Sequence, residues 1–189
     1  LRRQRQMCIR DRVCTAQPAV QMKNVNPDER SWCREHLWQN VRHPYYAMLE
    51  RGETEPLLTL FRYYSRFQEI NRFRAMRYYH AEGQHNTEMT LSCGLQSPEI
   101  YGTNRVNVPD GYAENRWGGA VDISPGLELS GLMLDYYFFT GDQAFLTATL
   151  LPYYYDLLRY IETRFPSVEN GKMQIGPLNC ICLLYTSPS

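Results

Sequence analysis

SPGLELSGLMLDYYFFTGD, residues 124–142, is the stretch of sequence that decides the fold. Ser124 and Pro125 are residue types favoured at the first positions of a helix, and Gly141 is the type favoured directly after its end. The apolar residues between them fall on nearly every side of a helix with 3.6 residues per turn. Because such a helix is expected to pack against neighbours on more than one side, the stretch predicts a buried helix inside a larger helical assembly.

The residues that follow predict the partner helix of a hairpin. Thr140, Gly141 and Asp142 are expected to end the first helix and start the next, which runs over residues 142–165. Pro152 leaves open whether this segment is one helix or two. A turn at ENGKM and a short strand at residues 173–175 come after it. The apolar residues expected on the buried side are Phe145, Leu150, Tyr154, Leu157, Leu158 and Ile161.

Two more helices are expected upstream. Residues 32–50 have apolar residues at spacings of three and four, and Gly52 is expected to end the helix. Thr54 and Pro56 then start a helix that the pattern extends to residue 79, about seven turns. The side expected to be buried consists of Leu57, Leu60, Phe61, Tyr64, Phe67, Ile70, Asn71 and Arg74, of which only the last two are polar.

Residues 80–123 lie between the two helical parts and lack any sustained period. A connection of this length in a compact domain is usually functional or disordered. The aromatic residues Tyr101, Tyr112 and Trp117 and the low charge argue against disorder. We therefore expect an ordered, irregular loop over one end of the helical assembly.

The two ends of the chain differ from the rest. Residues 1–14 and 182–189 resemble translated sequencing-adapter read-through, so we treat them as non-native tails and exclude them from the reasoning on the fold; a basic N-terminal arm is the alternative for residues 1–14. The remaining residues 15–181 are expected to be a fragment of one domain. Cys33 and Cys93 are too isolated there to predict a disulfide framework.

Charge and motifs exclude several classes of function. The whole chain has 20 basic and 20 acidic residues, which gives no reason to expect nucleic acid or an anionic membrane as partner. No apolar run is long enough to span a membrane. The sequence has no GxGxxG, P-loop or GxSxG motif and no His, Cys and acidic residues at metal-ligand spacing. We therefore expect no metal and no cofactor, and the sequence assigns no compartment.

Three stretches resemble the six-hairpin glycosidases, in particular the α-L-fucosidase-like glycoside hydrolases and a related bacterial family: residues 37–52, 80–90 and 116–145. The family pattern E-G-x-x-x-P-E-T-M-T-x-x-G is matched at Glu82, Gly83, Glu88 and Gly94. The pattern G-L-E-L-x-x-M-M-L-D-Y-Y-x-x-T-G-D is matched over residues 126–142 except at Leu132, where the pattern has methionine. The chain departs from the family at Thr87, where the pattern has proline, and at Cys93, where it has an aromatic residue.

The resemblance implies an all-α fold, a partial (α/α)6 toroid of helical hairpins with a long irregular loop. A closed ring of six hairpins needs twelve helices, and this chain predicts about four. The remainder of the barrel would then be a partner of this fragment, and the fragment alone is expected to expose apolar surface.

The resemblance also implies a glycoside hydrolase that acts on an oligo- or polysaccharide by general acid–base catalysis, with a carbohydrate as its partner. This chemistry needs two carboxyl groups across the scissile bond, and Glu88, between Gly83 and Gly94, is the candidate acid. The competing interpretation is that Glu88 caps a helix or pairs with an arginine. The candidate substrate-binding residues are Glu82, His85, Asn86, Arg116 and Trp117.

Other interpretations stay open. Glu128 and Asp135 lie on the otherwise apolar helix, and we expect them to have a structural role, bonding to the backbone ends of neighbouring helices. One alternative function is a non-catalytic carbohydrate-binding or structural helical toroid. Another is an (α/α)6 polysaccharide lyase or phosphorylase, for which His80, His85 and Arg105 are available.

Overall fold

The computed structural model describes residues 35–96, 106–107 and 123–176, and these are mostly helical. The predicted tails, Arg105, Arg116 and Trp117 lie outside the described residues. The elements run in the order β1 (Glu35–Leu37), α2 (Trp38–Glu50), α3 (Thr54–Ser65), α4 (Gln68–Tyr79), β2 (Met89–Leu91), α6 (Ser124–Thr140), α7 (Gln143–Phe145), the π-helix η2 (Leu146–Leu150), α8 (Leu151–Arg164), β3 (Val168–Glu169) and β4 (Lys172–Met173).

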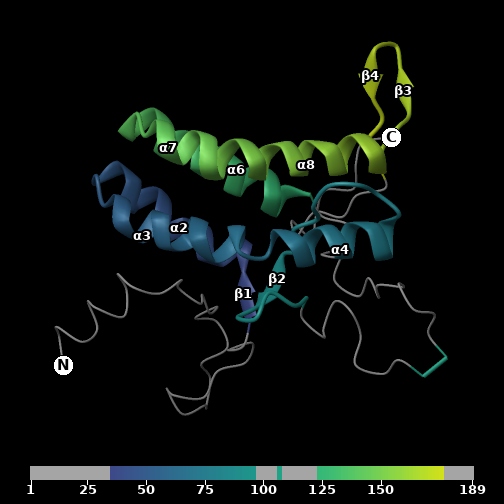
Figure 1. Ribbon diagram of the computed structural model, residues 1–189, viewed down its shortest axis with the longest axis horizontal. Coiled ribbons are helices and arrows are strands. Elements are labelled where there is room, and N and C mark those ends of the chain that lie inside the picture. Colours follow the sequence, from purple (N-terminus) through teal and green to yellow (C-terminus); the bar gives the residue numbers. More distant parts are fainter. Residues whose placement is uncertain (1–34, 97–105, 108–122, 177–189) are drawn as a thin grey trace, which may run out of the picture.

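Helix α6 joins the two halves of the described structure. It packs against α2 and α3 on one side and against η2 and α8 on the other, while α4 packs against α8. In Figure 1, α7 and α8 form one row, and α2, α3 and α4 form a second row beneath it. The predicted helical class is therefore confirmed, with α6 at the centre of the contacts.

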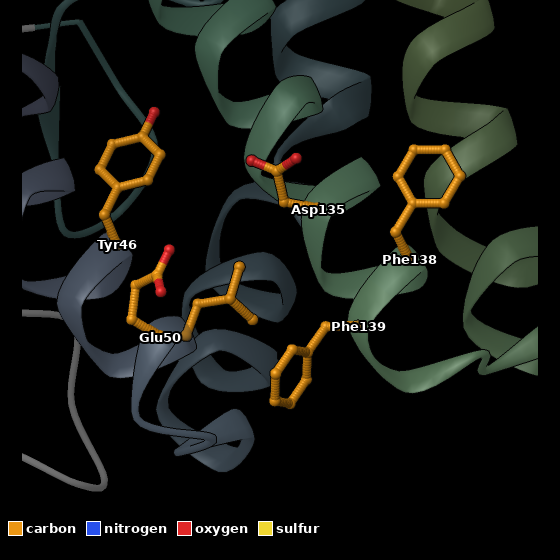
Figure 2. Close-up of a pocket in the computed structure, with 6 residues that line it drawn as sticks. Tyr46, Glu50, Asp135, Phe138 and Phe139 are labelled. Carbon is orange, nitrogen blue, oxygen red and sulfur yellow. The ribbon is translucent and has the colours of Figure 1, made fainter.

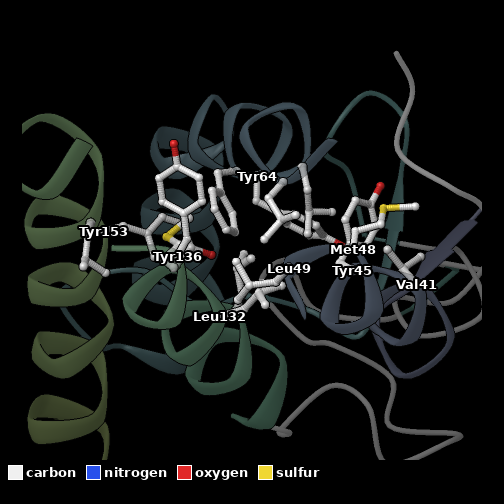
Figure 3. Close-up of a cluster of buried hydrophobic side chains, with 14 of the residues drawn as sticks. Val41, Tyr45, Met48, Leu49, Tyr64, Leu132, Tyr136 and Tyr153 are labelled. Carbon is white, nitrogen blue, oxygen red and sulfur yellow. The ribbon is translucent and has the colours of Figure 1, made fainter. Parts of the chain in front are cut away.

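The main core lies where these helices meet (Figure 3). Side chains of α2, α3, α6 and α8 interdigitate there, and the rings of Phe61, Tyr136 and Phe145 pack with centroid distances of 4.7 to 5.6 Å. Each fully buried leucine of this core contributes about 1.5–3 kcal/mol to folding. Its largest fully buried members are Trp38, Tyr45, Tyr153, Phe61, Leu57, Leu60, Leu129, Leu132 and Met133.

One side of α6 is not covered in the described structure. Leu134 and Phe138 are 41% and 73% exposed, although the apolar pattern predicted burial nearly all round. The opposite side, with Leu129, Leu132 and Met133, is fully buried. The described structure thus exposes apolar surface on α6, as expected for a helix with neighbours on only part of its circumference.

The helix predicted over residues 54–79 is wrong as a single helix, because Arg66 and Phe67 interrupt it and separate α3 from α4. Phe67 has φ −100° and ψ 10°. Its ring lies so close to Gly94 that a Cβ added to this glycine would be 2.2 Å from a ring atom. The guanidinium of Arg66 lies over the same ring at 4.7 Å. Packing of Phe67 against the following loop accounts for the interruption.

The buried stripe predicted for this segment is nevertheless correct at its polar end. Asn71 and Arg74 on α4 are 5% and 4% exposed, whereas Phe73 and Met76 are 64% and 54% exposed. Helix α4 therefore turns a polar side inward. The helical spacing predicted that Asn71 and Arg74 face inward, because residues three and four apart lie on the same side of a helix whatever their polarity.

The first strand was not expected. Residues 35–37 belonged to a predicted helix, but they form β1, which pairs antiparallel with β2 in the register Glu35–Leu91, His36–Thr90 and Leu37–Met89. Strand β2 lies inside the segment predicted as irregular. The pairing occupies the backbone groups before Trp38, so α2 begins only at that residue.

Residues 143–164 form one continuous helical run despite Pro152. The run widens at η2, where the N–H of Leu151 donates to the carbonyl of Leu146. Phe145, Leu150, Leu157 and Ile161 are buried as predicted. Tyr154 and Leu158, by contrast, are 40% and 37% exposed, and the buried positions are instead occupied by Tyr153, Asp156 and Tyr160.

The turn predicted after α8 is confirmed. Asn170 and Gly171 have φ values of 52° and 74° and join β3 to β4 in an antiparallel hairpin. Two consecutive positive φ values are what a type I′ hairpin turn requires. Strand β4 ends at Met173, where the predicted strand begins.

Candidate functional site

The segment that contains the predicted site, residues 80–94, runs from the end of α4 past α8 to the start of α2; we call it the acidic loop. It lies directly against the backbone of α8. At Gly83 the approach is so close that an added Cβ would be 2.1 Å from the carbonyl oxygen of Asp156. The N–H of Gln84 donates to that same oxygen at 3.0 Å, and its side-chain amide donates to the carbonyl of Tyr153 at 2.8 Å. The positive φ of Gly83, 80°, permits this approach.

Arg74 holds the acidic loop from the side of α4. Its guanidinium donates to the carbonyl of His85 at 3.2 Å and to that of Gly94 at 3.0 Å, and also to Oδ1 of Asn71 at 2.6 Å. Burial lowers the pKa of Arg74 to about 10. One buried side chain thus joins both ends of the stretch in which Glu88 lies.

Glu88 lies at the start of α2. Its side chain is buried, with the residue 5% exposed, and Oε1 accepts the backbone N–H of Gln39 at 2.7 Å. Its backbone carbonyl accepts the N–H of Trp38 at 3.0 Å. The residue before the helix, Leu37, supplies no side-chain cap. A carboxylate at a helix N-terminus satisfies an otherwise unpaired N–H and lies at the positive end of the helix dipole.

A second carboxylate reaches the same helix from α6. Glu128 accepts the indole N–H of Trp38 at 2.7 Å and an N–H of the Arg42 guanidinium. Burial acts to lower the pKa of Arg42, but the hydrogen bond and charge of Glu128 and the nearby Glu88 outweigh it, and the pKa is raised. Two carboxylates and one guanidinium therefore lie around the first turns of α2.

This placement corrects the structural role expected for Glu128 and Asp135. Glu128 bonds to the side chains of Trp38 and Arg42 rather than to the backbone end of a helix. Asp135 is exposed on α6 and needs no buried partner. The grouping of Arg42 with Glu128 was not predicted; its only signals in the sequence are the one-turn spacing of Trp38 and Arg42 and a lone glutamate among apolar residues.

His85 and Asn86 are fixed inside the acidic loop. His85 is 1% exposed, and its ring packs against Tyr79 and Tyr160 with centroids 4.7 and 5.1 Å away. Asn86 donates from its side-chain amide to the hydroxyl of Tyr153 and accepts from Asn71 at 3.4 Å. Both side chains therefore contact α4 and α8 rather than an open surface.

Glu82 points away from this interior. Its side chain is 58% exposed and pairs with Arg159 of α8 at 2.8 Å. Of the predicted site residues, the structure thus places Glu88, His85 and Asn86 in the buried part of the acidic loop and Glu82 on its outer side. Arg116 and Trp117, the other two candidate substrate-binding residues, lie outside the described residues.

A groove of about 440 Å³ lies at the opposite end of α2, between α2 and α6 (Figure 2). Tyr46 lies eight residues after Trp38, which is about 12 Å along the helix. The groove is therefore separate from Glu88. It is lined by Tyr46, Leu49, Glu50, Asp135, Phe138 and Phe139.

Within the part of the chain that the structure describes, no three His, Cys, Asp or Glu side chains gather as a metal site. Among those same residues, no helix has the length and apolar character needed to cross a bilayer. Comparison with protein families, with curated proteins and with solved structures returned no match for this chain.

Proposed function

We propose that this chain is part of a glycoside hydrolase of the six-hairpin type, which cleaves an oligo- or polysaccharide by general acid–base catalysis. Glu88 donates the proton to the leaving oxygen, and Glu128 is the second carboxylate. The observation that supports this assignment is that both side chains reach the start of α2 from different parts of the chain. Glycoside hydrolysis requires two carboxyl groups that flank one bond.

The contacts of the two carboxylates fit different roles. Glu128 is ion-paired with Arg42, and its side chain is 33% exposed, so it can meet water in its ionised form. A general base that activates water needs both properties. Glu88 is held in place, because Arg74 fixes the loop on both sides of it. Fixed geometry is what a proton donor to a glycosidic oxygen requires.

We further propose that the described helices are a slice of an (α/α)6 toroid. The exposed apolar residue Leu134 on α6 supports this proposal, since a further hairpin of a ring would cover it. The remainder of the barrel is then the partner that completes the substrate cleft.

One observation favours a second candidate, a non-catalytic helical toroid. Glu88 accepts the N–H of Gln39, and that bond alone gives it a structural role as a helix cap. The competing interpretation made from the sequence therefore has a contact to support it. The two candidates differ in what happens when the carboxyl group of Glu88 is replaced by an amide that keeps the hydrogen bond to Gln39.

The test is Glu88→Gln in a protein that contains this segment within a complete domain. Glutamine still offers an oxygen to the N–H of Gln39, so the unfolding temperature should stay close to that of the wild type. A glutamine cannot donate the catalytic proton, and kcat on an oligosaccharide should fall about 10²- to 10⁴-fold.

The matched control is Glu162→Gln, an exposed glutamate on α8 whose side chain is 59% accessible. It should leave kcat unchanged. Full activity of Glu88→Gln would remove Glu88 from catalysis and leave the non-catalytic toroid as the better candidate.

A further inference from the structure

The groove between α2 and α6 has one wall from each helix. Tyr46 and Glu50 are four residues apart and so share one side of α2. Asp135, Phe138 and Phe139 are spaced by three and four residues and share one side of α6. Figure 2 shows the two sets on opposite sides of the opening. The volume, about 440 Å³, is in the range of small-molecule sites.

The aromatic rings of the groove are accessible to a ligand. Tyr46, Phe138 and Phe139 are 39%, 73% and 57% exposed. The tip of the Phe139 ring lies near Gly52, 3.7 Å from where a Cβ on that glycine would be. Aromatic faces carry negative electrostatic potential, so three rings around one opening favour a positively charged group.

The charged groups add to this preference. Glu50 and Asp135 place one carboxylate on each wall, and no basic side chain lines the groove among the described residues. Neither carboxylate has an ion pair with another described residue. Arg42 is one turn before Tyr46 and pairs with Glu128, and Arg51, directly after Glu50, pairs with Glu53. The groove thus has two negative charges and no described counter-ion.

We infer that the groove between α2 and α6 binds an organic cation, a quaternary or protonated amine on a small apolar body. The cationic head lies between the carboxylates of Glu50 and Asp135, and the apolar body contacts the phenylalanine rings. An anion would be repelled by both carboxylates. An inorganic cation would leave the aromatic surface unused, and the described residues hold no cluster of three metal ligands. This binding does not depend on the role of Glu88.

Choline is the probe, and 3,3-dimethyl-1-butanol is its uncharged counterpart of the same shape. Titration calorimetry of the full chain should give saturable binding of choline and none of the alcohol. Asp135→Asn and Glu50→Gln should each weaken choline binding about fivefold, the effect of one unit charge at about 4 Å in water. Phe138→Ala should weaken it as well, because the ring face is lost.

The control is Glu169→Gln, which removes an exposed carboxylate from the β3–β4 hairpin far along the chain and should leave choline affinity unchanged. Circular dichroism verifies that each variant is folded; these positions are exposed, so their substitution removes no core contact. Equal binding of choline and the alcohol, unaltered affinity in Asp135→Asn, or no saturable binding at all would each overturn the inference.

Discussion

Single residues determine how closely the acidic loop approaches the helices. Gly83 lies against the backbone of α8, and Gly94 against the ring of Phe67, at distances that leave no room for a side chain. Arg74 then bonds to carbonyl groups on both sides of Glu88. The sequence pointed to Asn71 and Arg74 as inward-facing through their helical spacing. Their bond to each other follows from the helical spacing, but the sequence could not show their other partners, which come from the loop.

Gly83→Ala should be among the most damaging single changes in the chain. Its φ of 80° already costs an alanine about 1–2 kcal/mol, and the contact with the carbonyl of Asp156 adds about 1–3 kcal/mol of overpacking. We expect a loss of about 3 kcal/mol or more in the free energy of unfolding, measured in urea. Gly141→Ala is the control, because its φ is also positive, 67°, but nothing lies within 4 Å of the added Cβ. Equal losses in the two variants would contradict the close packing inferred at Gly83.

At the scale of the element, the π-helix η2 explains which side of α8 is buried. A regular helix that buries Phe145 would next bring Thr149 and Pro152 inward. The widened turn absorbs one residue, and the buried side continues instead at Leu150 and Tyr153. The sequence pattern nevertheless placed Leu150 on the buried side after this step. Its wrong assignments, Tyr154 and Leu158, lie beyond the step in the regular helix α8.

Deletion of Ala148, an exposed residue inside η2, should be tolerated. The π-turn would become an α-turn, and the residues on both sides of it would keep their buried faces. Deletion of Tyr155, which is 68% exposed in the regular part of α8, should instead rotate everything after it by about 100°. That rotation would turn Tyr160 out of its contacts, and the loss should exceed about 3 kcal/mol. Similar losses for the two deletions, measured by thermal unfolding, would refute the explanation.

At the scale of the whole molecule, the described helices share a core rich in tyrosine. Burial raises the pKa of Tyr79 to about 12 and that of Tyr64, Tyr153 and Tyr160 further. The helical class and the central place of residues 124–140 follow from the sequence, because an apolar pattern on all sides leaves few other arrangements. The pairing of β1 with β2, the break at Phe67 and the meeting of Glu88 with α2 do not, because each depends on contacts between distant segments.

Because of the buried tyrosines, the free energy of unfolding should fall as the pH rises above 10. Their pKa is higher in the folded state than the unfolded value of 10, so the stabilisation is fully present below pH 10 and is lost as the pH rises towards the folded values. For Tyr79 alone, a difference of two pH units corresponds to about 2–3 kcal/mol. We expect tyrosinate absorbance and loss of helical circular dichroism to appear together above pH 10. Tyr79→Phe should reduce the slope of stability against pH, and a flat stability profile up to about pH 12 would contradict the burial of these hydroxyl groups.

The most direct test of the proposed function is whether the loss of kcat in Glu88→Gln depends on the leaving group of the substrate. If Glu88 protonates the departing oxygen, the variant should lose about 10²- to 10⁴-fold in kcat on a glycoside with a poor leaving group, such as a second sugar. It should lose little on a dinitrophenyl glycoside, whose leaving group departs without a proton. An equal loss on both substrates would show that Glu88 only supports the structure of the acidic loop and α2, and the catalytic assignment would then be wrong.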